Sequence, residues 1–126
     1  MVIGCDIVFI PRIEKIYARH GERFLDRFLS EEEKKLIKNP SSLAGFFAAK
    51  EATLKALGTG ISMQSGFLDV RIIKDERNAP FVRLRQSLVD KFKIKSSSLS
   101  ISHDGNFAIA VVVLESEQEF RTPAFT

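Results

Sequence analysis

The segment from residue 46 to residue 60, FFAAKEATLKALGTG, constrains the fold of this chain more than any other. It is almost wholly apolar or small, as in a helix that is buried all round, yet it carries Lys50, Glu51 and Lys55. Glu51 and Lys55 are four positions apart and therefore project from the same helix face. A carboxylate among apolar neighbours is costly unless a positive group satisfies it. The segment therefore predicts a core helix that also carries a candidate binding or catalytic site.

The length of the chain limits its architecture. Its 126 residues suit one domain spanning residues 1–126, and 44% apolar with 28% charged residues is the balance of an ordinary soluble protein. A domain of this size can bury one core but has little room for a deep cleft of its own. An active site that is shared between subunits is therefore one arrangement to consider.

The chain contains one cysteine, Cys5, which excludes an intrachain disulfide and a cysteine-rich zinc site. We expect Cys5 to be a small buried hydrophobe, the usual state of a free cysteine. The apolar run from Met1 to Ile10 contains Asp6, lacks a basic segment before it and is too short to span a membrane. The expectation is a cytoplasmic protein. A net charge of +3 permits an acidic partner without requiring nucleic acid.

Punctuating residues divide the first third of the chain into elements. Val2–Phe9 reads as a buried strand that is apolar on both faces apart from its one aspartate. Helical turns come next, and Gly21 interrupts them. Ser30 and Glu33 predict a capping box at the start of the next helix, which Asn39-Pro40 ends.

The long helix and the elements after it complete an α+β pattern. Ser41 or Ser42 is expected to cap this helix, which runs to about Leu57, and Gly58 is its expected stop. The other expected elements are a loop at Gly60–Gly66, strands at Phe67–Lys74 and Phe81–Arg85, a helix at Gln86–Lys93, a hairpin of Leu99–Ser102 with Phe107–Leu114, and a loose tail from about Ser116. This order predicts a single α+β domain in which a mainly antiparallel sheet packs on one long helix.

Asp6 is the first candidate site residue because its strand is otherwise apolar. One interpretation is a structural carboxylate that caps a helix or pairs with a buried arginine. The other is a metal ligand that acts together with Glu51. Two carboxylates suit Mg²⁺, which keeps several waters and is often held by one or two carboxylates and the phosphates of a substrate.

Lys50, Lys55 and His103 have a structural and a functional interpretation each. Lys55 is either the salt-bridge partner of Glu51 or a contact to a phosphate beside the metal. His103 follows Ser102 at a strand end and is either a structural residue or a phosphate contact. The Gly58-Thr59-Gly60 sequence is not a P-loop, because its lysine and its spacing do not fit one.

The N-terminal helices carry a basic ridge beside an apolar seam. Arg12, Arg19, Arg23 and Arg27 fall at helical intervals next to the apolar series that begins at Ile13. Such a surface suits an acidic helical partner. The alternative is a solvated amphipathic helix, because acidic residues are interspersed.

Three segments together resemble one known family. They are Gly4-Cys5-Asp6-Ile7-Val8, the helix Phe47-Ala48-Ala49-Lys50-Glu51-Ala52-Thr53-Leu54-Lys55-Ala56 with Gly58-Thr59-Gly60, and Ser100-Ile101-Ser102-His103. Their order and spacing, and the chain length, are similar to those of the holo-acyl-carrier-protein synthases, the short phosphopantetheinyl transferases. The resemblance covers essentially the whole chain.

The resemblance implies the transfer of phosphopantetheine from coenzyme A to a serine of an acyl carrier protein for fatty acid biosynthesis, with Mg²⁺, in a trimer with sites between subunits. The roles it implies are metal binding for Asp6 and Glu51, catalysis for these two and Lys55, coenzyme A binding for Lys50, Lys55, Gly58, Ser102 and His103, and carrier binding for Arg12, Ile16, Arg23, Phe24 and Arg27. The proton of the serine goes either to Glu51 or to a water held by the metal. The residues do not choose between these.

The chain departs from the pattern of the family at three places. Phe9 and Phe46 stand where the family often has Glu and Arg, and Asn78-Ala79-Pro80 replaces the usual Gly-Lys-Pro turn. By the resemblance, Phe9 would remove a contact to the metal. Phe46 would remove a contact to coenzyme A, and the Asn78-Ala79-Pro80 turn would alter the adenine side of its pocket. Asp6 and Glu51 are unaffected.

Two other classes of function are weighed against the enzyme. A non-catalytic module would bind an acidic helical protein through the arginine ridge alone, without coenzyme A or Mg²⁺. Nucleic-acid binding is the weaker alternative, because the basic excess is small and no strand carries the aromatic and basic pattern of an RNA-binding sheet.

Overall fold

A computed structural model gives the fold and describes residues 1–58 and 66–118. Except for Gly66, the loop expected at Gly60–Gly66 lies outside the described residues, as do Thr59 and the tail beyond residue 118. The elements are β1 (Val2–Phe9), α1 (Ile10–His20), α2 (Glu22–Phe28), α3 (Glu31–Lys34), α4 (Pro40–Leu57), η1 (Phe67–Asp69), β2 (Val70–Lys74), β3 (Pro80–Leu84), α5 (Gln86–Phe92), β4 (Ile94–Asp104) and β5 (Phe107–Ser116).

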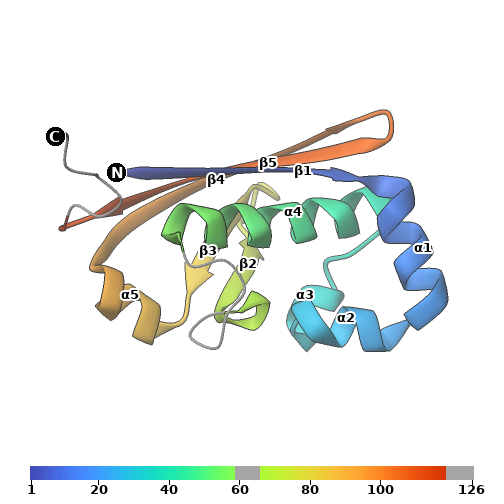
Figure 1. The fold of residues 1–126 in the computed structure, drawn as a ribbon, viewed down its shortest axis with the longest axis horizontal. Coiled ribbons are helices and arrows are strands. Elements are labelled where there is room, and N and C mark those ends of the chain that lie inside the picture. Colours follow the sequence, from blue (N-terminus) through green and yellow to red (C-terminus); the bar gives the residue numbers. More distant parts are fainter. Residues whose placement is uncertain (59–65, 119–126) are drawn as a thin grey trace, which may run out of the picture.

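The strands form two antiparallel sheets, and both sheets contact α4. β1, β5 and β4 make a three-stranded sheet in that order, and β2 pairs with β3. Figure 1 shows α4 lying along the larger sheet, with the β2–β3 hairpin passing behind the helix. β3 also contacts β4 of the larger sheet. The predicted α+β fold, with antiparallel strands packed on one long helix, is confirmed. No helix in these two described ranges is long and apolar enough to span a bilayer.

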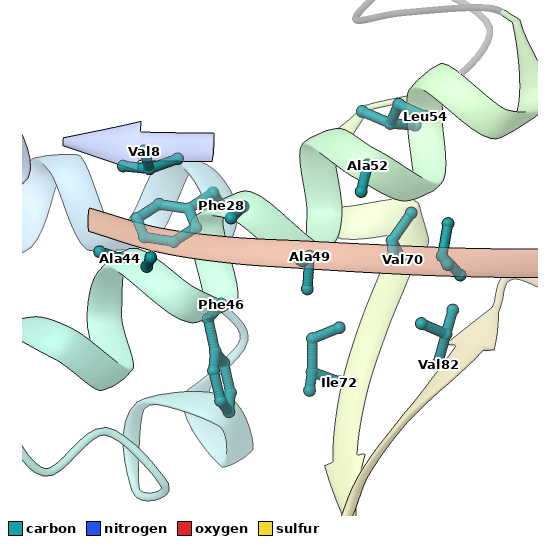
Figure 2. Close-up of a cluster of buried hydrophobic side chains, with 14 of the residues drawn as sticks. Val8, Phe28, Ala44, Phe46, Ala49, Ala52, Leu54, Val70, Ile72 and Val82 are labelled. Carbon is teal, nitrogen blue, oxygen red and sulfur yellow. The ribbon is translucent and has the colours of Figure 1, made fainter. Parts of the chain in front are cut away.

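Small residues allow the larger sheet to approach α4 closely. Ala48, Ala52 and Ala56 of α4 are fully buried, as are Ala108 and Ala110 of β5. Larger side chains fill the opposite side of the helix, and Figure 2 shows members of the core from β1, α2, α4, β2 and β3. Because α4 is covered on both sides, its sequence is apolar all round.

Gly4 fixes the position of β1 on this helix. A Cβ atom built on Gly4 would lie 1.9 Å from the carbonyl oxygen of Ala52 and 2.9 Å from the backbone nitrogen of Ala56. Only a residue without a side chain permits this approach of strand to helix. The contact brings Asp6, two positions further along the same face of β1, towards the second half of α4.

The ends of the helices confirm some of the predicted signals and correct others. Ser30 and Glu33 form the predicted capping box, with hydrogen bonds of 2.9 and 3.2 Å. Gly58 ends α4 in the left-handed conformation with φ 77°, as expected. The expected cap at Ser41 or Ser42 is wrong: Asn39 caps α4 and Ser42 completes its capping box. Asn39-Pro40 therefore starts this helix, because proline is favoured in its first turn.

The boundaries of the strands differ from those expected. Phe67–Asp69 is a 3₁₀ turn, and the strand after it begins only at Val70. β4 starts at Ile94 rather than Leu99 and continues through His103 to Asp104. The hairpin turn is therefore formed by Gly105 and Asn106 alone. The serines of β4 hid this strand from a prediction based on apolar residues.

The expectation that β1 is buried on both faces is wrong, and so is the burial of Cys5. Burial alternates along β1, and its outward side chains, Cys5 among them, are exposed. Ile3, Ile7 and Phe9 are 62%, 62% and 43% exposed on this face. The outward face of β1 is therefore apolar, and no other described residue covers it.

Candidate active site

The contact between β1 and α4 joins three of the predicted site residues. The Asp6 side chain is 8% exposed, and its Oδ1 accepts a hydrogen bond of 2.7 Å from Nζ of Lys55. Nζ of Lys55 also donates to the carbonyl oxygen of Cys5 at 3.2 Å. Among the described residues, the carboxylate paired with Lys55 is thus Asp6 and not Glu51, which was the structural alternative for this lysine.

Glu51 lies half-buried beside Asp6. Burial, then the negative charge of Asp6 and a hydrogen bond with it, raise the pKa of Glu51 to about 7, while Lys55 and Arg12 act in the opposite direction. Because these effects favour its protonated form, the carboxyl group of Glu51 keeps a proton up to near neutral pH. The two carboxylates therefore form a site that would favour a bound cation.

The unsatisfied oxygen of Asp6 supports the same conclusion. Oδ2 of Asp6 is buried and accepts no hydrogen bond from a nitrogen or hydroxyl donor of the described residues. A proton on Glu51, or a cation in its place, would satisfy this atom. Residues 1–58 and 66–118 contain no cluster of three or more acidic, histidine or cysteine side chains that could hold a metal. Two carboxylates fit Mg²⁺, which takes its remaining ligands from water and phosphate oxygens, better than they fit Ca²⁺ or Zn²⁺.

Lys55 is a permanent cation at this site. Its hydrogen bond to Asp6, followed by the charges of Asp6 and Glu51, raises the pKa of Lys55 above its ordinary value. The side chain is 56% exposed, so the ammonium group remains accessible from solvent. Lys55 is therefore suited to stabilise negative charge on a phosphate and poorly suited to accept a proton.

The structure places Lys50 elsewhere. Its side chain is fully buried, and Nζ donates to Oε1 of Glu33 at 2.8 Å, to the carbonyl oxygen of Phe67 at 3.2 Å and to that of Phe28. These partners use all three donors of the ammonium group. The expectation that Lys50 contacts coenzyme A does not fit this position and is withdrawn. Sequence reasoning recognised Glu33 only as a capping residue and missed its ion pair.

The other predicted coenzyme A residues lie apart from the carboxylate pair. Ser102 and His103 are exposed on β4, which is separated from β1 by β5. The register aligns His103 with Ala108 and Val8, and Asp6 with Ala110 and Ile101. With strands about 4.8 Å apart, this places the two residues roughly 10 Å from Asp6 within one chain. Gly58 is exposed at the end of α4, one turn beyond Lys55.

The predicted basic ridge is exposed on α1 and α2. Arg12, Arg23 and Arg27 are exposed, while Ile16 and Phe24 are half-buried among them. The ring of Phe24 lies 6.2 Å from that of Phe47, one turn before Glu51 on α4. The charge of Arg12 acts on Glu51. The ridge therefore adjoins the carboxylate pair.

The structure places all three departures from the family pattern. Phe46 is 2% exposed in the core, so it does not line a polar pocket (Figure 2). Phe9 packs its ring 5.3 Å from that of Phe107 on the outer face of the larger sheet. In the β2–β3 turn, Asn78 adopts a left-handed conformation with φ 64°, which asparagine tolerates well.

The fold and the paired carboxylates fit an enzyme that acts on a phosphate-containing substrate. Comparison with known sequences identifies its family. The sequence profile of the 4'-phosphopantetheinyl transferase superfamily matches residues 2–112, and the chain belongs to this superfamily. Within it, the chain is similar to proteins named holo-[acyl-carrier-protein] synthase. That of Campylobacter jejuni subsp. doylei is 57% identical over 114 residues, covering 90% of this chain and 99% of that protein. That of Wolinella succinogenes is 52% identical over 114 residues, with 90% and 97% covered.

Solved structures agree. Helicobacter pylori holo-[acyl-carrier-protein] synthase in complex with coenzyme A matches with a TM-score of 0.87 and 53% identity, over 90% of this chain and 99% of that one. The Bacillus anthracis synthase, in complex with CoA (3',5'-ADP), matches with a TM-score of 0.77 and 38% identity, over 92% and 96%.

Proposed function

We propose that this protein transfers the 4'-phosphopantetheine group of coenzyme A to a serine of an apo-acyl carrier protein, as a holo-[acyl-carrier-protein] synthase of fatty acid biosynthesis. The observation that carries the proposal is the buried Asp6–Glu51 pair beside the cation of Lys55, in a chain of this superfamily. The relatives named above are holo-[acyl-carrier-protein] synthases, and one of them has been solved with coenzyme A.

The reaction breaks one phosphorus–oxygen bond and forms another. The serine hydroxyl of the carrier attacks the phosphorus atom that bears the pantetheine arm, and its proton passes either to Glu51 or to a water molecule at the site. The bond from this phosphorus to the bridging oxygen of the pyrophosphate breaks, and adenosine 3',5'-bisphosphate leaves. The ammonium group of Lys55 is placed to stabilise the charge that develops on the leaving phosphate.

Asp6 and Glu51 would hold Mg²⁺ in this enzyme. A bound Mg²⁺ neutralises pyrophosphate charge so that an oxygen nucleophile can approach the phosphorus. Asp6 is held by Lys55, and β1 presents it at the helix through the close approach at Gly4. The unsatisfied Oδ2 of Asp6 and the raised pKa of Glu51 are the features that Mg²⁺ would relieve.

The assembly we propose is a homotrimer whose active sites lie between subunits. Its support is the apolar outer face of the larger sheet, where Ile7 pairs with Ile109 and Phe9 with Phe107. Ile109 and Phe107 are 37% and 48% exposed, and uncovered patches of this kind mark interfaces. Because His103 and Ser102 lie two strands from Asp6 in one chain, a second copy would supply them, and Gly58 would come from the first.

The partners we propose are coenzyme A, the acidic acyl carrier protein and two further copies of the chain, in the cytoplasm, without nucleic acid or membrane. Arg12, Arg23 and Arg27, with Ile16 and Phe24 between them, would receive the carrier. Their exposure beside Glu51 supports this role. Arg–carboxylate pairs would orient the carrier so that its serine reaches the site.

The test is to incubate the protein with coenzyme A, Mg²⁺ and apo-carrier and to measure the carrier by mass spectrometry. We expect one added phosphopantetheine on the serine, and none with Glu51→Ala, whose circular dichroism spectrum should match that of the parent. An unmodified carrier would refute the proposed function.

Charge reversal at Arg23 separates the enzyme from a module that only binds a carrier. Arg23→Glu in the enzyme should raise the KM for the carrier while leaving coenzyme A binding unchanged. A binding-only module would lose carrier affinity and would show no coenzyme A binding in either form.

A further inference from the structure

Two arginines face each other on the outer side of the β2–β3 ribbon. The antiparallel register places Arg71 directly opposite Arg83, and both side chains are exposed. Neither forms an ion pair with a described residue. Like charges that are directly opposite on a sheet are destabilising, so the ribbon keeps this pair at a cost to its own stability.

A third arginine completes the cluster. Nε of Arg85 donates to Oδ1 of Asp69 at 2.5 Å, which holds this guanidinium group at the same end of the ribbon. Together with Leu68 and Leu84, these residues line a cavity of about 200 Å³. The lining holds three arginines and one carboxylate, and the charge of Arg71 also acts on the exposed Glu32 nearby. With Glu32 included, positive charges still exceed negative ones at this cavity.

The arginine cluster (Arg71, Arg83 and Arg85) is continuous with the ridge on α2. Leu68 and Asp69, which line the cavity of the cluster, also line a second cavity of about 500 Å³ with Phe24 and Arg27. Leu68 is 48% exposed between the two cavities. One band of surface therefore runs from basic residues on α2 across an apolar centre to the basic end of the ribbon.

We propose that the arginine cluster is a second docking point for the acidic carrier protein, and this rests on the proposed function. Arginine binds carboxylates through two parallel hydrogen bonds, and an unpaired Arg71–Arg83 pair offers such donors without first breaking an internal ion pair. A carrier that contacts Arg27 would reach the cluster across Leu68. Charge complementarity and the shared cavity walls identify the occupant as the same acidic protein.

The experiment compares Arg71→Gln/Arg83→Gln with the matched control Lys91→Gln/Lys95→Gln, which removes the same charge at exposed positions on α5 and β4. We expect the KM for apo-carrier to rise about three- to tenfold in the arginine variant, with kcat and the KM for coenzyme A unchanged. Its KM should also respond less to added salt. Thermal stability should stay equal or rise, because a like-charge pair has been removed.

Calorimetric titration of apo-carrier without coenzyme A keeps this test separate from the proposed function. Weaker binding by the arginine variant alone supports the docking point even if the parent shows no transfer. Equal affinity and KM in the arginine variant and the parent would overturn it, and so would an equal change in the lysine control. A higher KM for coenzyme A with an unchanged KM for carrier would assign the cluster to a phosphate of coenzyme A and likewise overturn it.

Discussion

Asp6 and Glu51 place two carboxylates side by side. Their negative charge can be reduced either by a proton on Glu51 or by a bound metal ion. In the protein without metal, burial and the charge of Asp6 raise the pKa of Glu51 from 4.5 to about 7. Below pH 4.5 the folded and unfolded states both carry the proton. Between these values the unfolded chain releases it and the folded chain retains it, so this group makes the fold less stable as the pH rises. Above pH 7 the whole cost is present.

Replacing Glu51 by glutamine should remove this pH dependence. In EDTA, the melting temperature of Glu51→Gln minus that of the parent should increase as the pH is raised from 4.5 to 7 and then level off. Mg²⁺ above pH 7 should reverse the sign of the difference, because only the parent holds the ion with both carboxylates. Calorimetric scans across this range measure it. A difference that does not change with pH would contradict the retention of this proton by Glu51.

At the residue scale, the sequence singled out the two carboxylates that the structure brings together, but it did not reveal their neighbours. Asp6 and Glu51 stand out because a charge in an apolar segment is costly wherever it lies. That Lys55 bonds Asp6 and Lys50 bonds Glu33 depends on packing between residues 49 and 17 positions apart, which no helical spacing reveals. Helix neighbours four positions apart suggested Lys55 with Glu51, and tertiary contact overrode that suggestion.

At the scale of the elements, the contact between β1 and α4 positions Asp6 in the candidate active site. Gly4→Ala should lower the free energy of unfolding by about 1–3 kcal/mol, because its Cβ would lie 1.9 Å from the oxygen of Ala52. Transfer activity should fall as well, since β1 carries Asp6. Gly66→Ala is the control, because its Cβ meets no atom within 4 Å. Denaturant titration and the carrier assay measure both effects. A Gly4→Ala protein with parental stability and activity would exclude the role of this contact.

The Glu33–Lys50 ion pair joins α3 to α4 and contacts three further elements, which are α2, η1 and β2. Oε2 of Glu33 accepts from the backbone nitrogen of Ile72 at 2.8 Å, while Lys50 reaches the carbonyl oxygens of Phe28 and Phe67. Lys50→Met should cost about 3–5 kcal/mol, because it leaves the carboxylate of Glu33 buried and unpaired. Lys50→Met/Glu33→Gln should cost less than the two single changes together. Urea unfolding of all four proteins gives the coupling. Strict additivity would show that the charges do not interact.

Periodicity predicted the helices of this fold better than its strands. The helices α1, α2, α4 and α5 lie close to where apolar spacing, Gly21 and Gly58 indicated. α3 begins after Ser30 as predicted but ends at Lys34, well before the predicted end at Asn39-Pro40. β4 extends beyond its prediction because its outward serines carry no apolar signal. β1 seemed buried on both faces because its exposed face is also apolar. An exposed apolar face has the composition of a buried one, and a single sequence does not separate the two.

At the scale of the whole molecule, the separation of His103 from Asp6 leads us to predict that two subunits share each active site. If one copy supplies Lys55 and its neighbour supplies His103, two different inactive variants can repair each other. Lys55→Met and His103→Ala should each transfer poorly when pure. After the two are unfolded, mixed in equal amounts and refolded, random trimers would contain about a quarter of their sites with both residues intact. The mixture should therefore recover about a quarter of the parental activity in the carrier assay.

The control for this complementation is a variant that cannot assemble. Ile7→Glu places a charge on the apolar outer face, where Ile7 is 62% exposed, and should give monomers in analytical ultracentrifugation. Adding Ile7→Glu to both partners should abolish the recovered activity. If instead each site is contained in one chain, the mixture would show only the average of its two inactive parents. Lys55 and His103 would then have to meet within a single copy, which the register of β1, β5 and β4 opposes.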